Sequence, residues 1–188
     1  MYTSYILFNN FYKYLTFKFE KSTNFAIFLK SNKNYYFLLH CRLSTNFFTY
    51  QLSDMFAYEL SIRRAVGSLV SDPFDATPRS PFILVYNLHN LLFNNRVFIF
   101  VKILSQSGHY SNISTITELF ANSNWLEREI AELNGVQFFF KKDLRNLMLQ
   151  YGDVSTPFRK AFPSIGFRET VYDLINDSVV QSRIDLQN

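Results

Sequence analysis

Glycine and proline are scarce in this sequence, at 5 residues each among 188. This excludes collagen-like and linker-like chains, which are rich in both residue types. The glycines are also isolated from one another, at Gly67, Gly108, Gly135, Gly152 and Gly166. A Rossmann or Walker loop needs clustered glycines, so we expect no nucleotide-binding loop.

Metal-ligating residues are equally few. An iron–sulfur cluster generally takes four thiolates and a structural zinc ion four Cys or His ligands, but the chain has only Cys41, His40, His89 and His109. His40 and Cys41 are adjacent, and neighbours on a helix point about 100° apart, which favours a half-buried core cysteine over a catalytic pair. We expect this chain to bind no cofactor or metal.

Charge and hydrophobic content indicate an ordinary folded chain. The net charge is +4 and charged residues make up 18%. This positive charge is small for a nucleic-acid-binding protein, which must neutralise many phosphates. Hydrophobic residues make up 48%, with 22 Phe and 12 Tyr, enough for the core of one domain. Phe, Tyr, Asn, Ile and Lys have AT-rich codons, which indicates an AT-rich, organellar genome.

No targeting or membrane segment is predicted. No Arg occurs before Arg42, whereas a transit peptide is rich in Arg and Ser. The most apolar stretch, residues 82–104, is interrupted by Asn, His, Arg and Lys, whereas a spanning helix needs about 20 largely apolar residues.

Residue patterns predict the elements of the N-terminal half. Residues 2–19 have no steady period and fit either a helix or an extended arm. Residues 34–43 fit a helix with these side chains facing a core: Phe37, Leu38 and Cys41, with Leu39 and Leu43 as further candidates. Residues 47–60 fit a strand, with Phe48, Tyr50 and Leu52 in alternation. Residues 61–81 fit an exposed loop, either with or without a short helix. Residues 82–89 and 96–103 form a hairpin that turns around Asn94-Asn95, since Asn tolerates positive φ.

A second helix is predicted over residues 125–133. Asn124 can cap it, Glu127 and Glu129 meet its positive end, and Gly135 supplies a left-handed stop. Its buried stripe comprises Leu126, Ile130 and Leu133. We then expect a short strand over 136–140, a short helix over 143–149, and turns at Tyr151-Gly152, Pro157 and Pro163.

Two charged groups suggest functional interpretations. Glu127 and Glu129 could be paired catalytic carboxylates, but a solvated helix face with Arg128 and Glu132 paired at i, i+4 is favoured. A basic cluster interleaves with aromatic residues. Its members are Lys141, Lys142, Arg145, Arg159 and Lys160, and the aromatics are Phe138, Phe139, Phe140, Tyr151, Phe158 and Phe162. The aromatics could stack on single-stranded RNA, although packing of these rings in a core is favoured. Arg159 lies in a turn-prone segment and should make a bidentate contact, either to a carboxylate or to backbone carbonyls. The partner would belong either to another subunit or to the helix that contains residues 127–129. Lys160 should lie nearer solvent.

Five short blocks carry a family resemblance. They are Trp125-Leu126-Glu127-Arg128-Glu129, Leu133-Asn134-Gly135-Val136-Gln137-Phe138, Asp143-Leu144-Arg145, Tyr151-Gly152 and Pro157-Phe158-Arg159-Lys160-Ala161-Phe162-Pro163. Together they resemble the thirty-kilodalton subunit, organelle-encoded subunit 9, of respiratory complex I, NADH:ubiquinone oxidoreductase. Weaker similarity reaches back to Tyr35. The family usually has a His-Pro pair where Lys141-Lys142 stand.

The resemblance implies an α+β fold, a small mixed β-sheet with flanking helices and an extended C-terminal tail. Residues 1–33 would be an extension, 34–150 the domain, with 61–81 inserted, and 151–188 a partner-binding tail. The chain would be a non-redox subunit of this enzyme's peripheral arm, on the matrix side of the mitochondrial inner membrane, beside the forty-nine-kilodalton-type quinone-pocket subunit. FMN, iron–sulfur clusters and quinone would be held by partner subunits. The interface residues implied are Trp125, Glu127, Arg128, Glu129, Arg145, Tyr151, Gly152, Pro157, Arg159, Lys160, Phe162 and Pro163.

A rival hypothesis is an organelle-encoded ribosomal protein that binds rRNA, which fits the codon bias and positive charge equally well. A free-standing hydrolase is disfavoured because no nucleophile and base pattern is present.

Overall fold

The computed structural model describes residues 15–18, 25–30, 33–44, 49, 51–59, 82–92, 94–103, 105–106, 109–110, 113–153, 155–160 and 162–184. The predicted 61–81 loop and the aromatics Phe47, Phe48 and Tyr50 lie outside these residues. The elements are β1 (Leu15–Lys18), β2 (Phe25–Lys30), α2 (Asn34–Leu43), β3 (Gln51–Glu59), β4 (Phe82–Asn90), β5 (Asn95–Ile103), β6 (Ser105–Gln106), β7 (His109–Tyr110), β8 (Ile113–Ser114), α3 (Ser123–Asn134), β9 (Phe138–Phe139), β10 (Arg168–Asp173) and β11 (Ser178–Arg183).

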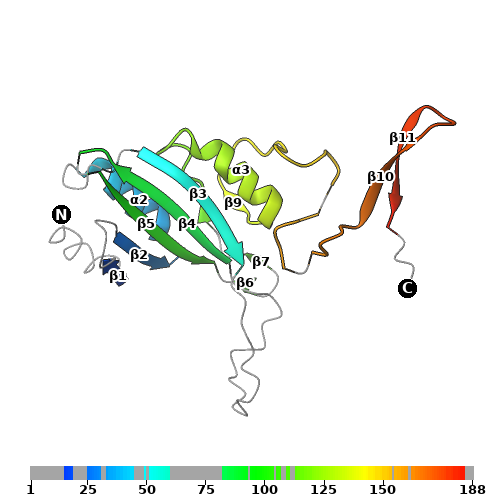
Figure 1. Ribbon diagram of the computed structural model, residues 1–188. Coiled ribbons are helices and arrows are strands. Elements are labelled where there is room, and N and C mark those ends of the chain that lie inside the picture. The colour runs from blue at the N-terminus through cyan, green and yellow to red at the C-terminus, as the bar shows by residue number, and fades with distance from the viewer. Residues whose placement is uncertain are drawn as a thin grey trace, which may run out of the picture.

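A five-stranded mixed sheet with the order β1-β2-β5-β4-β3 forms the centre of the fold (Figure 1). β2 and β5 run parallel, and the other neighbours are antiparallel. Short two-stranded pairs, β6 with β7 and β8 with β9, accompany it. The predicted α+β class with a small mixed sheet and flanking helices is confirmed.

The β4–β5 hairpin is the middle of this sheet. Its register runs from Phe82 opposite Ile103 to Asn90 opposite Asn95, and Asn94 in the turn has φ 48°. The predicted hairpin and its left-handed asparagine are confirmed. No helix within the described ranges is long and apolar enough to cross a membrane.

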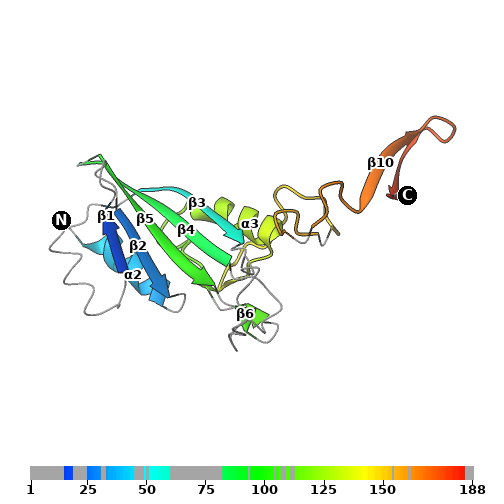
Figure 2. The same cartoon turned by 60° about the horizontal axis from the view of Figure 1, so that its bottom comes forward.

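The core lies between the sheet and two helices that pack on the same face (Figures 1 and 2). Alternate residues of β4 and β5 point into it, as the period of a strand requires, and Ile130 of α3 joins the same cluster. From α2, Phe37, Leu38 and Cys41 are buried as predicted, but Leu43 is exposed. Leu43 follows Cys41 by two residues, which is about 200° around a helix. Leu43 therefore faces away from the core.

The two N-terminal strands belong to this sheet. β1 pairs with β2, and β2 pairs in parallel with β5 from Phe25 opposite Val97 to Lys30 opposite Lys102. Of the segment 2–19, predicted as a helix or an extended arm, residues 15–18 are extended, as in the second alternative, and the others lie outside the described residues. We expected residues 1–33 as an extension, but the hydrogen bonds of β2 place 25–30 inside the domain. Its pairing partner lies far along the chain, so no local pattern reveals it.

The C-terminal hairpin stands apart from the sheet. β10 and β11 pair antiparallel, from Arg168 opposite Arg183 to Asp173 opposite Ser178, and project away from the remainder of the chain (Figures 1 and 2). The predicted extended tail is thus a two-stranded hairpin, reached through turns at residues 151–167.

Candidate functional site

α3 carries a buried carboxylate, Glu127, whose two oxygens are both bonded. Thr115 Oγ1 donates to Oε2 at 2.6 Å, and the Ile116 amide donates to Oε1 at 2.8 Å. Lys141 Nζ lies 3.1 Å from Oε2 and also donates to the carbonyl oxygen and Oδ1 of Asn124, at 3.1 and 3.0 Å. The Lys141 and Glu127 side chains are 1% and 0% exposed. Charges so deeply buried are tolerable only when paired and fully hydrogen-bonded, as here.

The next residue of the helix, Arg128, is also nearly buried. Its Nε donates to the Arg145 carbonyl at 2.8 Å and its Nη2 to the Asn146 carbonyl at 3.0 Å, while the guanidinium lies 5.1 Å from the centre of the Trp125 ring. Asp143 is 3.6 Å from Arg128 and makes a forked pair with Arg145 at 2.9 and 3.0 Å. The hydrogen bonds from Arg145, with its charge and that of Arg128, hold the pKa of Asp143 well below its usual range.

One helical turn further on, the Glu132 carboxylate accepts three successive backbone amides. These are Leu147 at 3.0 Å, Met148 at 2.9 Å, and Leu149. Burial alone would raise the pKa of Glu132, but the three amides and the nearby charge of Arg128 outweigh it and lower that pKa. Consecutive amides that converge on one anion are a recurrent anion-binding arrangement, here filled by the protein's own side chain.

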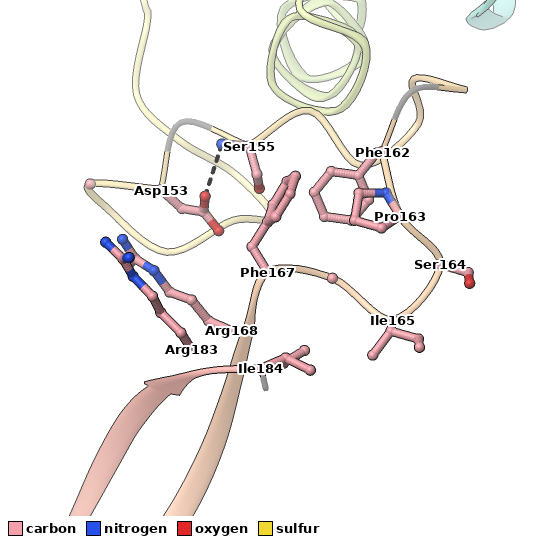
Figure 3. Close-up of a pocket in the computed structure, with 12 residues that line it drawn as sticks. Asp153, Ser155, Phe162, Pro163, Ser164, Ile165, Phe167, Arg168, Arg183 and Ile184 are labelled. Atoms are coloured by element: carbon pink, nitrogen blue, oxygen red, sulfur yellow. Dashed lines mark hydrogen bonds between the residues drawn. The ribbon is translucent and has the colours of Figure 1, made fainter. Parts of the chain in front are cut away.

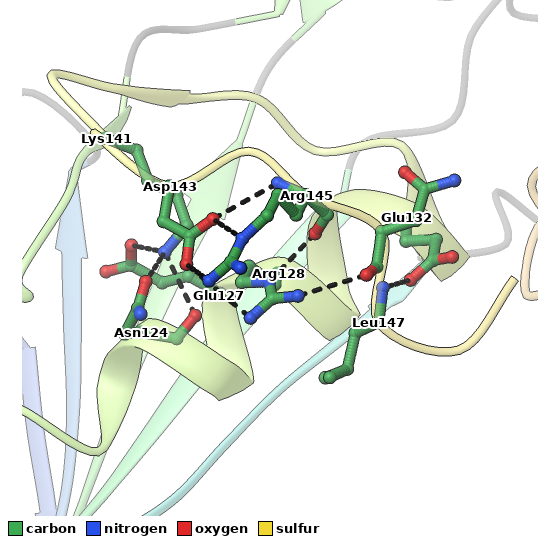
Figure 4. A network of polar contacts seen from close by, with 9 residues as sticks. Asn124, Glu127, Arg128, Glu132, Lys141, Asp143, Arg145 and Leu147 are labelled. Carbon is green, nitrogen blue, oxygen red and sulfur yellow. Dashed lines mark hydrogen bonds and ion pairs between the residues drawn. The ribbon is translucent and has the colours of Figure 1, made fainter. Parts of the chain in front are cut away.

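These contacts hold the 141–149 segment along α3 (Figure 4). The predicted helix over 143–149 is wrong because Arg128 and Glu132 bind the carbonyls and amides that a helix would use for itself. The predicted solvated face is wrong too, since Glu127 and Arg128 are buried. Asn124 does not cap the helix, because it lies within α3 and its side chain binds Lys141.

Stability should fall in acid because of Glu132. Its folded-state pKa is lower than its ordinary value, so the stabilisation is complete above the unfolded pKa of about 4.3 and is lost as the pH falls below it. We expect the urea midpoint to decline from about pH 6 to pH 3, and Glu132→Gln to flatten this decline. Glu129→Gln is the control, since Glu129 on the same helix makes no hydrogen bond or ion pair with any described residue; an equal flattening there would contradict the assignment.

Gly135 ends α3 as predicted, with φ 72° and its amide bonded to the Ala131 carbonyl at 3.0 Å. Arg159 reaches this end: Nε donates to the Asn134 carbonyl at 3.1 Å and Nη2 to the Gly135 carbonyl at 3.5 Å. The predicted two-pronged contact of Arg159 with backbone carbonyls is confirmed, at the C-terminal end of α3. Lys160 is exposed as expected. A cation at this end is favoured by the helix dipole.

Replacing Gly135 with alanine should destabilise the fold by about 1–2 kcal/mol, the cost of a left-handed L-residue, plus the cost of moving Arg159. A Cβ at Gly135 would lie 2.6 Å from Arg159 Nη2. Gly152→Ala is the control, because Gly152 has φ +87° and its Cβ would meet nothing within 4 Å. Urea unfolding should show the larger loss for Gly135→Ala; equal losses would mean that Arg159 moves aside freely.

Most of the aromatic residues around the basic cluster are exposed. Only Phe138 is buried, and the following are open to solvent: Phe139, Phe140, Tyr151 and Phe158. The expectation that these side chains pack in a core is therefore wrong for most of them. The cluster is not continuous either, since Lys141 is buried against Glu127 whereas Lys142 is exposed.

The residues implied as interface by the resemblance fall into two structural groups. Glu127, Arg128, Arg145 and Arg159 bind other parts of this chain through the contacts above. The remaining members are all exposed or half-exposed: Trp125, Glu129, Tyr151, Gly152, Pro157, Lys160, Phe162 and Pro163. The structure brings the first group together around α3 and spreads the second over α3 and the turns that follow.

Sequence reasoning missed three participants: Thr115, Asn124 as a ligand of Lys141, and Glu132 as an acceptor of amides. Only Glu132 had a detectable signal, its i, i+4 spacing from Arg128, and that was interpreted as a surface pair. Cys41 is buried, and burial raises the pKa of its thiol. Among the residues that the structure describes, no group of three or more His, Cys, Asp or Glu is placed to hold a metal ion.

The fold and site thus define an α+β chain in which α3 organises the segments that follow it. A family model described as the 30 kDa subunit of respiratory-chain NADH dehydrogenase matches residues 48–168. The chain belongs to this family, which confirms the resemblance seen in its motifs.

Curated relatives carry the names of complex I subunits. NADH-ubiquinone oxidoreductase subunit 9 of Paramecium primaurelia is 38% identical over 91 residues, 48% of this chain and 41% of that protein. NADH dehydrogenase [ubiquinone] iron-sulfur protein 3 of Oryza sativa subsp. japonica is 33% identical over 105 residues, 56% of this chain and 53% of that protein. The probable NADH-ubiquinone oxidoreductase 30.4 kDa subunit, mitochondrial, of Candida maltosa is 35% identical over 105 residues, which are 56% of this chain and 37% of that protein. The chain spans about half the length of the curated relatives it matches.

A solved structure shares the fold. A chain in the membrane-bound sulfane sulfur reductase, an archaeal respiratory membrane complex, superposes with a TM-score of 0.51 at 13% identity and covers 84% of this chain and 78% of that chain. At this identity the likeness concerns the fold alone.

Proposed function

We propose that this chain is a non-redox subunit of the peripheral arm of proton-pumping NADH:ubiquinone oxidoreductase, complex I. Its place would be the matrix side of the mitochondrial inner membrane, beside the forty-nine-kilodalton-type subunit that shapes the quinone pocket. Family membership supports the assignment to this enzyme. The role is positional, because electron transfer to quinone requires neighbouring subunits to be held rigidly.

The observation that carries a docking role is the exposed apolar surface of the C-terminal region. Leu174 and Ile175, at the tip of the hairpin, are 85% and 93% exposed, and Ile165, Phe167 and Val179 are also open to solvent. An isolated two-stranded hairpin is only marginally stable in water, and large exposed apolar patches mark interaction sites. A partner subunit that covers these side chains would stabilise the hairpin and remove the apolar surface from water.

The buried polar network complements this surface. The ion pair of Glu127 with Lys141 and the contacts of Arg128 fix the 141–149 segment and therefore the start of the C-terminal region. Among the residues implied as interface, exposed ones such as Trp125 and Tyr151 would contact the partner. Buried ones such as Arg128 would hold the surface in shape.

We further propose that the chain binds no cofactor of its own, with FMN, iron–sulfur clusters and quinone held by partner subunits. The single cysteine and isolated glycines support this. The chain purified alone should show no flavin or iron–sulfur absorbance and no stoichiometric iron. Iron bound tightly at one or more equivalents would contradict the proposal.

Purification of the native assembly through a tag on this chain tests the function. Flavin and iron–sulfur absorbance, NADH oxidation, and chemical cross-links from this chain to the quinone-pocket subunit should accompany it. Recovery of rRNA in place of these components would instead support the ribosomal hypothesis.

A further inference from the structure

A hollow of about 870 Å³ lies at the base of the C-terminal hairpin. One wall is apolar: the rings of Phe162 and Phe167 meet edge to face at 5.1 Å, and Ile165 lines the same hollow. On the opposite side Arg168 and Arg183 lie next to each other at the roots of β10 and β11 (Figure 3). The site is thus apolar on one side and cationic on the other.

The two arginines form a like-charge pair. They are directly opposite in the hairpin register, and side chains of directly opposed residues project from the same face of the hairpin, where like charges destabilise each other. Neither guanidinium makes a hydrogen bond or ion pair with a described residue. An anion bound by both guanidinium groups would relieve this repulsion and could accept forked hydrogen bonds from them.

Asp153 is the acidic residue that lines the hollow. Its Oδ1 already accepts the Ser155 amide at 2.8 Å, and these Ser155 hydrogen bonds, with the charge of Arg168, lower the pKa of Asp153. Asp153 can therefore offset one of the two positive charges. One positive charge remains without a counterpart.

We propose that this hollow receives an acidic segment of a neighbouring subunit, with an Asp or Glu carboxylate against Arg168 and Arg183 and an adjacent apolar side chain against Phe162 and Phe167. The inference deepens the proposed function and rests on it. A single carboxylate matches the remaining charge and the forked guanidinium geometry. The phosphates of a polyphosphate or nucleic acid would be repelled by Asp153, which disfavours either as the occupant.

Charge reversal in the full-length chain tests the cationic side. In cells that lack the wild-type chain, Arg168→Glu/Arg183→Glu should lower incorporation into complex I at least about tenfold, since an interfacial charge pair turned repulsive costs several kcal/mol. The control is Lys102→Glu/Lys142→Glu, which changes the net charge equally at two exposed lysines away from the hollow. It should assemble like the wild type.

A photo-crosslinking residue at Ile165 identifies the occupant without disturbing the arginines. Ile165 is exposed and lines the apolar wall. In purified, assembled complex I the cross-linked peptide should come from another subunit and contain Asp or Glu. Replacing that carboxylate by Lys should restore assembly of the Arg168→Glu/Arg183→Glu variant.

The outcomes separate this inference from the proposed function. If the wild type assembles and the arginine variant assembles equally well, or if Ile165 cross-links only within its own chain, the acidic-segment site is refuted and the subunit role stands. If the wild-type chain is not in complex I at all, the proposed function fails and this inference fails with it. Cross-linking to rRNA would refute both.

Discussion

Replacing Lys141 with methionine should lower the free energy of unfolding by about 3–5 kcal/mol, because it leaves Glu127 buried and unpaired. Lys141 supplies the charge that neutralises Glu127, and its three donors are used by Glu127 and by two oxygens of Asn124. Methionine fills similar volume but donates nothing. Urea denaturation of the purified chain at neutral pH measures the loss.

Two further variants establish the cause. Lys142→Met, at the adjacent exposed lysine, should change stability by no more than about 0.5 kcal/mol. Glu127→Gln/Lys141→Met should be more stable than Lys141→Met alone, because no buried charge remains. If the double variant is no more stable than Lys141→Met, the loss comes from packing and the buried-charge explanation is wrong.

Removing residues 164–188 should abolish incorporation into complex I while leaving the domain folded. A cut after Asp153 would also remove Arg159 and its contacts with the end of α3, so the sharper cut falls after Pro163. The deleted part contains the hairpin and its exposed apolar tip. It contributes little to the core cluster, none of whose members lies beyond Phe138.

Incorporation can be followed on native gels, with urea unfolding of the purified truncated chain as the folding control. Its midpoint should match that of the full chain. Leu174→Ser/Ile175→Ser, confined to the tip, should weaken assembly to a smaller extent, by loss of buried apolar area. Normal assembly of the truncated chain would show that the tail is not an anchor.

The hairpin, α2 and α3 were predictable because each has a local signal. Asn94 and Gly135 mark backbone positions with positive φ, and Phe37, Leu38 and Cys41 share one face of α2. The family resemblance added the α+β class and the importance of residues 125–163. Local pattern and motif together therefore account for the middle of the chain.

The 141–149 segment and the N-terminal strands were not predictable for a physical reason. Their conformation depends on partners distant in sequence: Glu132 for the amides of residues 147–149, and β5 for β2. Lys141 is a further case, since the sequence places it beside Lys142 in a basic cluster and gives no sign of its partner. Only the tertiary structure reveals that its ammonium group lies against Glu127.

The strand order also constrains how the chain folds as it leaves the ribosome. β2, at residues 25–30, hydrogen-bonds to β5 at residues 95–103, so it has no sheet neighbour on that side until most of the domain has been synthesised. β4 and β5 are adjacent in the chain and close through a short turn, and loop closure over few residues is the cheaper step. The β4–β5 hairpin can therefore close locally, and its β5 edge is the template to which β2, although made earlier, is added only afterwards.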